Sequence, residues 1–479
     1  MAEPTSRRKL VVLAICCMSL LIVSLDNTVL NVALPVMGRE LDASVTGLQW
    51  TIDAYTLVLA SLLMLAGSTA DRIGRRKVFL AGLALFTLGS LLCSLAPTLE
   101  SLVAFRMIQA VGGSMLNPVA MSIITNTFTD PAERARAIGV WGGVVGISMA
   151  AGPLIGGLLV DTVGWRSIFW INLPVGIAAF LLTLRYVPES RAPHPRRADP
   201  VGQLLIIALL GSLTYAIIET DLVFAVVAVL ALIGVVLYEP RRREPLIDLR
   251  FFRSAPFSGA TVIAVAAFAS LGGFLFLNTL YLQNVRGYSA LHAGLYMLPM
   301  AAMTFVCAPL SGRMVGSRGP RLPLLIAGVA MGACGVLFAA FGAETSDPLL
   351  FTGFVLFGIG FGLVNTPITN TAVSGMPRAQ AGVAAAVAST SRQIGQTLGV
   401  AVIGTVLAHG VHSTSVGSPG YADVFVDASR AAWWIIAGCG LCILVVGALT
   451  SGPWARRTAL SCAEHLGSDR PAGEPAGRR

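Results

Sequence analysis

Charged side chains stand inside long apolar stretches of this sequence, where a charge is costly. Asp26 lies about seventeen residues after Lys9, which at a rise of about 1.5 Å per helical residue places it past the middle of a membrane. An acid at that depth costs roughly 2.5–3.5 kcal/mol on insertion scales. Because burial disfavours the charged form of an acid, we expect this carboxyl group to bind and release a proton. The alternative is an acid held by a neighbouring hydroxyl group or arginine.

Two further charges lie within apolar runs. Arg106 is a permanent cation, so it must face a carboxylate or a water-filled cavity, and a purely structural tether is the alternative. Asp53 lies about one turn inside the outer end of the second run, between Trp50 and Tyr55. From the residues alone, these aromatic side chains form an interfacial belt and Asp53 is a water-exposed acid.

The segment that joins the second and third apolar runs, residues 67–77, is the most basic in the chain. It carries four cations in six residues together with one acid, Asp71. Gly67 and Gly74 permit close backbone approach and a tight turn. The sequence therefore predicts a short loop at the cytoplasmic membrane surface, because cytoplasmic loops hold an excess of Lys and Arg. We expect this segment to contribute the gating residues Gly67, Asp71, Arg72, Gly74 and Arg75, with Asp71 as a latch on the cytoplasmic side.

These residues must be positioned by membrane helices. Of the 479 residues, 55% are hydrophobic and 12% are charged, and the mean hydropathy is +0.77, whereas soluble domains are about 25% charged. Fourteen runs approach the length of about 20 residues that a span needs. With the N-terminus inside, 27 of the 33 Lys and Arg residues fall on the cytoplasmic side. This asymmetry predicts that both termini are cytoplasmic, and it explains the net charge of +9 without nucleic acid.

An internal repeat organises the fourteen runs. The segment 312–321 echoes 67–76, with the same glycine spacing, at an offset of 245 residues. We therefore predict an all-α membrane protein of two six-helix bundles with two inserted linker helices. The predicted parts are the first bundle with its loop (1–190), a cytoplasmic loop and the linker helices (191–250), the second bundle (251–455), and a disordered tail (456–479).

Several motifs give the chain a family resemblance. Three patterns resemble signatures of the major facilitator superfamily: Gly-x-x-x-Asp-Arg-x-Gly-Arg-Arg in 67–76, Arg-x-x-Gln in 106–109 and Gly-Pro-x-x-Gly-Gly in 152–157. Three further stretches resemble the 14-span drug:proton antiporter branch of this superfamily. They are the run 25–35, which contains Asp26, the pattern Trp50-x4-Tyr55, and the pattern Trp165-Arg166-x-x-Phe169-x-x-Asn172. Size and motifs are similar to methylenomycin-resistance-type antibiotic efflux proteins. Ala110 departs from the glycine that usually follows Gln109.

The resemblance implies roles for particular residues. Asp26 and Arg106 would couple transport to protons, and Asp53 would face a cationic substrate. The exporter motif in span 5 would belong to the gate, through Gly152, Pro153, Gly156 and Gly157. With Asp53, we expect Tyr55, Gln109, Asn365 and Gln393 to bind substrate, although polar residues of this kind also hold helices together.

We therefore expect a proton-coupled exporter of hydrophobic or cationic drugs in the bacterial cytoplasmic membrane, monomeric, with no cofactor or metal. A same-fold exporter of an endogenous metabolite is the alternative. An ATP-driven pump would need Gly-x4-Gly-Lys-Ser/Thr, which is absent from the sequence. A membrane enzyme would need a catalytic cluster, and the five histidines are scattered. The eight cysteines indicate buried apolar positions rather than disulfides.

Overall fold

The computed structural model describes residues 6–192, 199–242, 245–374, 381–411 and 414–468, and this part of the chain is helical throughout, with no strand. Fourteen helical segments are long and apolar enough to cross a membrane, as predicted. The elements are α1 (Ser6–Glu40), α2 (Val45–Ile73), α3 (Arg75–Ser94), α4 (Leu99–Thr127), α5 (Pro131–Thr162), α6 (Ser167–Trp170), α7 (Asn172–Tyr186), α8 (Pro200–Ile218), α9 (Leu222–Tyr238), η1 (Glu239–Arg241), η2 (Leu249–Arg253), α10 (Ala255–Leu280), η3 (Tyr281–Val285), α11 (Ala290–Tyr296), α12 (Leu298–Arg318), α13 (Arg321–Ala339), α14 (Asp347–Val373), α15 (Ala381–Val411), α16 (Tyr421–Thr450) and α17 (Pro453–Ser468).

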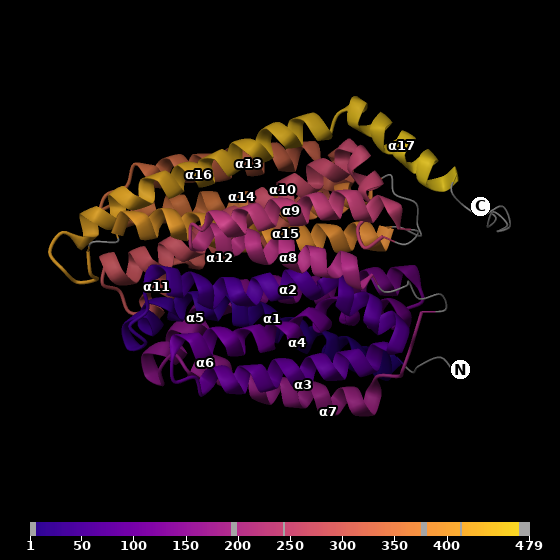
Figure 1. The fold of residues 1–479 in the computed structure, drawn as a ribbon, viewed down its shortest axis with the longest axis horizontal. Coiled ribbons are helices and arrows are strands. Elements are labelled where there is room, and N and C mark those ends of the chain that lie inside the picture. The colour runs from indigo at the N-terminus through magenta and orange to yellow at the C-terminus, as the bar shows by residue number, and fades with distance from the viewer. Residues whose placement is uncertain (1–5, 193–198, 243–244, 375–380, 412–413, 469–479) are drawn as a thin grey trace.

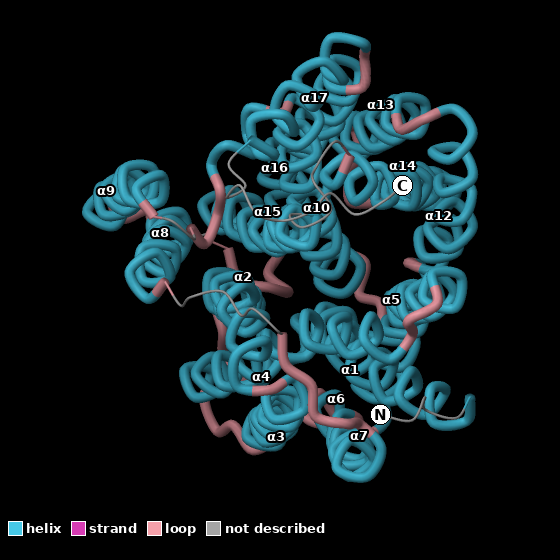
Figure 2. The backbone as a smooth tube through the Cα atoms, turned by 90° about the vertical axis from the view of Figure 1, so that its right-hand side faces the viewer, coloured by secondary structure: helices cyan, strands magenta, loops and turns pink. Residues whose placement is uncertain are grey.

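The helices form two bundles that lie side by side. Helices α1–α7 make the first bundle and α10–α16 the second, as the indigo-to-purple and pink-to-yellow ribbons of Figure 1 show. Helices α8 and α9 stand at one flank, where α8 packs against α2 and α15 (Figure 2). The beginning of α1 and the end of α16 lie at the same end of the molecule. We call this end the inner end and the opposite one the outer end.

The connection between α8 and α9 is short. Residues 219–221 join the two helices, and Thr220 adopts a positive φ of 54°. The Asp221 side chain accepts hydrogen bonds from the N–H groups of Val223 and Phe224, which caps α9. Both linker helices are therefore complete elements despite the three-residue turn.

The predicted repeat is present in the structure. Helices α2 and α3 are joined at Gly74 and helices α12 and α13 at Gly319, and both glycines adopt positive φ angles, of 126° and 80°. The prediction of a loop over 67–77 was wrong, however, because α2 continues to Ile73 and α3 begins at Arg75. The basic residues thus extend the helix ends beyond the apolar run, and a single glycine makes the turn.

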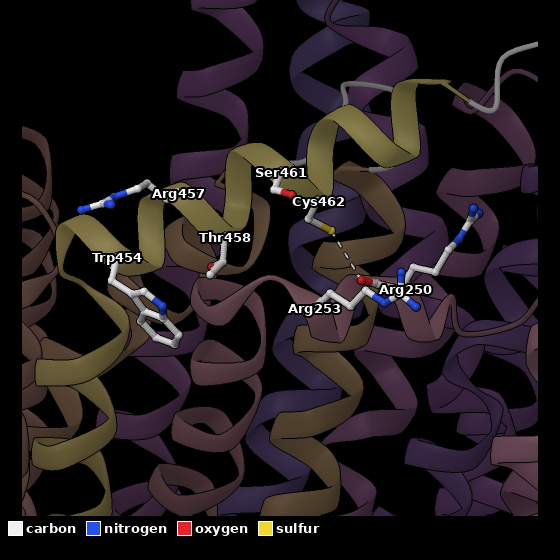
Figure 3. Close-up of a pocket in the computed structure, with 7 residues that line it drawn as sticks. All are labelled: Arg250, Arg253, Trp454, Arg457, Thr458, Ser461 and Cys462. Atoms are coloured by element: carbon white, nitrogen blue, oxygen red, sulfur yellow. Dashed lines mark hydrogen bonds between the residues drawn. The ribbon is translucent and has the colours of Figure 1, made fainter.

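The predicted disordered tail is also wrong for residues 456–468, which form most of α17, and residues 469–479 of that prediction lie outside the described residues. Ala455, Ala459 and Cys462 are buried at helical spacing, which gives this polar helix an inward face that the composition obscured. The helix lies across η2 and the beginning of α10, where the N–H of Ala255 donates to Thr458 Oγ1 at 3.0 Å. Figure 3 shows the groove between α17 and η2, at the surface of the second bundle. It is lined by Arg250, Arg253, Trp454, Arg457, Thr458, Ser461 and Cys462.

Glycines allow the helices to pack closely. In the first bundle, a Cβ atom on Gly112 of α4 would lie 2.3 Å from the backbone nitrogen of Phe86 in α3. In lipid, such backbone proximity supplies much of the attraction between helices, since burial from water is not available to drive it. The α3–α4 pair therefore has no space for a side chain at this position.

We predict that Gly112→Val lowers the thermal unfolding midpoint of the purified protein, because overpacking costs about 1–3 kcal/mol. Gly211→Val on α8 is the control, since no atom lies within 4 Å of its added Cβ. Unfolding monitored in detergent would measure both. Equal midpoints for the two variants would contradict the packing that we describe between α3 and α4.

Candidate functional site: a buried ion pair and two outer gates

Asp26 and Arg106 form an ion pair inside the first bundle, between α1 and α4. Arg106 Nη1 donates to Asp26 Oδ2 and to Gln109 Oε1, the latter at 2.8 Å. The other carboxylate oxygen, Oδ1, accepts from Gln109 Nε2 at 2.9 Å and from Asn172 Nδ2 at 3.0 Å. Asp26 is 4% exposed and Arg106 is fully buried. Both carboxylate oxygens therefore have donors, which suits the charged form of the acid.

Four helices hold this network in place. Gln109 lies one turn after Arg106 on α4, so both side chains reach the same carboxylate. Asn172 begins α7 and also donates to Ser90 Oγ of α3 at 3.0 Å, while Ser90 donates to the carbonyl oxygen of Phe169 at 2.9 Å. A shift of α1 relative to α3, α4 or α7 would consequently break at least one of these bonds.

The guanidinium group of Arg106 is only partly satisfied by hydrogen bonds. Its Nε and Nη2 atoms have no partner among the described residues. The ring of Tyr55 lies 4.1 Å from Cζ and the ring of Phe169 lies 5.9 Å away, which provides cation–π attraction. Charge on Asp26 therefore matters greatly, since breaking a buried pair by neutralising one partner typically costs about 3–5 kcal/mol.

The two bundles meet at the outer end, and one contact joins α2 to α15. Gln49 Nε2 donates to the carbonyl oxygens of Val400 and Ala401, at 3.2 and 2.9 Å. Deeper in the molecule, Thr397 Oγ1 donates to Thr56 Oγ1 at 2.9 Å. Gln49 and Thr56 are completely buried. We call this contact between the bundles the α2–α15 gate.

A second contact joins α5 to α11. The Asp161 carboxylate accepts from the N–H groups of Ala290 and Leu291, at 3.1 and 2.9 Å. A Cβ atom on Gly157 would lie 2.5 Å from Leu291 Cα, and one on Gly294 would lie 2.3 Å from the carbonyl oxygen of Pro153. We call this contact the α5–α11 gate, and its glycines bring the bundles to backbone distance.

The Gly-Pro-x-x-Gly-Gly motif of α5 therefore contacts helices of both bundles. Gly157 and Pro153 meet the second bundle, whereas Gly152 and Gly156 pack against Thr28 and Val29 of α1, one turn from Asp26. Added Cβ atoms on these two glycines would lie 2.0 Å from Thr28 Oγ1 and 2.9 Å from Val29 Cγ1. The motif thus links the helix that carries the acid to the outer contact between the bundles.

At the inner end, the basic segment makes its hydrogen bonds within the first bundle. Arg75 pairs with Asp71 at 2.7 Å, and the backbone around them bonds to residues 189–192 after α7. Arg72 is exposed. Among the described residues, every hydrogen bond that joins the two bundles directly lies at the outer end or near the middle of the helices. We infer from these contacts that the molecule is closed at its outer end.

The structure divides the other predicted site residues between these features. Tyr55 and Gln109 belong to the ion-pair network and are fully buried. Gln393 lies one turn inward of Thr397 on α15, and Asn365 Nδ2 donates to a carbonyl oxygen of its own helix. The interpretation of Asp53 as a water-exposed acid was wrong, because this residue is completely buried.

Sequence reasoning missed Ser90 and Asn172 as members of the network. Asn172 ends the motif Trp165-Arg166-x-x-Phe169-x-x-Asn172, yet nothing in the sequence placed it beside Asp26. A polar side chain that interrupts an apolar run was the available signal, because such a group needs a buried partner. Serine gives a weaker signal, since its hydroxyl can bond to its own helix.

Comparison with known proteins places the fold and the motifs in one family. Residues 16–400 match the family model described as Major Facilitator Superfamily. The chain is 39% identical over 418 residues to the multidrug resistance protein Stp of Mycobacterium tuberculosis, covering 85% of this chain and 78% of that protein. It is 35% identical over 431 residues to the methylenomycin A resistance protein of Streptomyces coelicolor, covering 86% and 90%. A bacterial homologue of the human lysosomal transporter Spinster has the same fold, with a TM-score of 0.66 and 18% identity over 99% of this chain and all of that one.

We predict that Asn172→Ala destabilises the protein by about 1.5–3 kcal/mol, because it removes a hydrogen bond to a charged group. Asn278→Ala is the matched control: Asn278 is equally buried, but it donates only to the Phe274 carbonyl oxygen of its own helix, at 2.8 Å. Thermal unfolding at neutral pH would compare them. If Asn172→Ala were no more harmful than its control, the network would not depend on this donor.

Proposed function

This chain belongs to the major facilitator superfamily, and we propose that it exports drugs or antibiotics across the bacterial cytoplasmic membrane in exchange for protons. It is a multi-pass membrane transporter and not an enzyme. Drug export is supported by the names of its relatives, which include a multidrug resistance protein and an antibiotic resistance protein. The observation that carries proton coupling is the buried pair of Asp26 and Arg106, with donors on both carboxylate oxygens.

The pair supplies a physical route from protonation to helix movement. A proton on Asp26 neutralises the carboxylate and removes its attraction for Arg106, whose remaining contacts are Gln109 and the rings of Tyr55 and Phe169. The cost of leaving Arg106 without its counter-ion favours a rearrangement of α1 against α4. Because Gly152 and Gly156 hold α1 against α5, this movement reaches the outer gates.

In the proposed cycle, the inner end is cytoplasmic and the bundles rock about the central contacts. The outer-closed state described here has a charged Asp26 and would receive drug from the inside. Opening to the outside would let Asp26 take up an external proton as the drug leaves. Gln393, Asn365 and the faces of α2 and α15 below Thr56 would line the substrate path.

The energy available from one proton is sufficient for useful export. One charge that crosses 100 mV supplies about 2.3 kcal/mol, and one pH unit adds about 1.4 kcal/mol. Together these sustain a concentration ratio of a few hundredfold, since each 1.4 kcal/mol is about tenfold. Export of an endogenous metabolite would use the same machinery, and resistance profiles after gene deletion would separate the two functions.

We predict that Asp26→Asn abolishes gradient-driven export, because an amide cannot exchange a proton. Drug accumulation in cells that express the protein, with and without a protonophore, would measure this. Asp427→Asn is the control, since Asp427 forms an exposed pair with Arg430 at the outer surface. Wild-type export that survives the protonophore, or an active Asp26→Asn variant, would exclude proton coupling through this acid.

We also propose that Asp71 latches the inner end when the molecule opens outward. In the outer-closed state it is held by Arg75, and a carboxylate near a helix N-terminus of the second bundle would be stabilised there by the helix dipole. Asp71→Asn is therefore expected to slow export, while Asp248→Asn, which affects a partly buried acid paired with the exposed Arg250, leaves its rate unchanged. An unchanged transport rate in Asp71→Asn would exclude the latch.

A further inference from the structure

Asp53 is a buried acid that the proposed proton pathway does not use. Its side chain is completely buried, and neither carboxylate oxygen has a hydrogen-bond partner among the described residues. Burying an isolated charge costs several kcal/mol even after the protein relaxes, and a neutral carboxyl group costs much less. The surroundings of Asp53 therefore accommodate the protonated acid and reject the carboxylate.

The position of Asp53 in the fold is unusual for a simple packing residue. It lies on α2 between Gln49 and Thr56, the two residues whose side chains bond to α15. Spacings of four and three residues place all three on one face of the helix. Asp53 is thus part of the contact between the two bundles, within the α2–α15 gate.

Among the described residues, no charged side chain forms an ion pair with this acid. Tyr55, two positions away and on the opposite face of α2, turns towards Arg106, which is paired with Asp26. Charged residues on the helices that pack against α2 make other contacts. Arg392 of α15 donates to Thr369 of α14, and Glu219 at the end of α8 accepts from the indole N–H of Trp50.

We propose that Asp53 is a second proton-binding site, loaded from the outside, which must hold a proton for the α2–α15 gate to close. When the gate opens, water reaches the carboxyl group and the proton returns to the outer solution. When it closes, the carboxylate takes up one external proton and becomes the neutral acid found here. This inference rests on the proposed exchange between outer-open and outer-closed states.

The two acids would then have different tasks. Asp26 belongs to a network within the first bundle and would carry the transported proton across the membrane. Asp53 binds and releases its proton on the same side, so it adds nothing to the number of protons exchanged per drug. It makes the gate sensitive to external acidity: a lower external pH favours closure, and a higher pH favours the outer-open state.

A distance measurement across the outer end can test this inference independently of transport. Spin labels would be attached to cysteines introduced at the exposed residues Glu100 and Ser415, one in each bundle, in the full-length protein in lipid nanodiscs. None of the eight native cysteines is exposed. Using the Asp26→Asn variant removes the contribution of the first acid to any pH dependence.

In that background, we expect the ratio of closed to open molecules to rise by up to about tenfold per pH unit as the pH falls, because one proton is taken up on closure. Adding Asp53→Asn should abolish this dependence and leave the gate mostly closed, since the amide is neutral and similar in shape. Asp53→Glu should restore a pH dependence. A ratio that does not change with pH in Asp26→Asn, or a slope that survives Asp53→Asn, would overturn the inference.

Asp161→Asn provides a control in the other gate. Asp161 is exposed and accepts two backbone N–H groups of α11, so its carboxylate favours closure in the charged form. This variant should shift the ratio towards the open state, because it removes a charged acceptor from that contact, and it should keep the slope, because Asp53 is still present. If the label distance never changed with pH or added drug, the exchange between two states would itself be wrong, and with it the role of Asp53.

Discussion

The structure of the first bundle depends on the attraction between Asp26 and Arg106. Neither residue could remain charged and buried alone, so α1 and α4 must stay within hydrogen-bond distance of each other. Gln109, Asn172 and Ser90 complete the arrangement and bring α3 and α7 to the same point. An interaction of this kind is conditional, because it loses its electrostatic basis when the acid gains a proton. The same contact can therefore stabilise one state of a transporter and release another.

At the outer gates, the contact between the two bundles is made by polar groups. A wholly apolar contact at the same place would be harder to separate. Gln49 bonds to backbone carbonyl groups of α15, and Asp161 bonds to backbone N–H groups of α11. Water can replace each of these bonds when the bundles separate, so opening requires little net loss of hydrogen-bond energy. Glycines such as Gly157 and Gly294 add close van der Waals contact that is lost on opening. In the proposed cycle, these contacts would be firm when closed and still able to open.

The inner end is built differently. The basic segment of α2 and α3 is bound to residues 189–192 of its own bundle, through backbone groups as well as through Asp71 and Arg75. Helix α17 likewise lies on η2 and α10 of the second bundle. In each bundle, the surface segments at the inner end thus bind to helices of the same bundle. The direct hydrogen bonds between the described parts of the two bundles lie at the outer end or near the middle of the helices. This asymmetry is what a carrier that alternates between two openings requires at one stage of its cycle.

The sequence by itself determined the number of spans, the repeat and which buried charges need a partner, because each follows from a local property. A run of apolar residues must be a helix in lipid, and a charge inside such a run must find a partner. Only the tertiary structure decided which groups meet. It brought Asn172 and Ser90 to Asp26, and it drew Gln109 into the network instead of leaving it open to substrate. It also placed Asp53 between the bundles, out of contact with water. Helical periodicity fixes the face on which a side chain lies, but the packing of α2 on α15 fixes what that face meets. For the same reason the helical tail was missed: its small buried face becomes visible only when η2 and α10 are there to receive it.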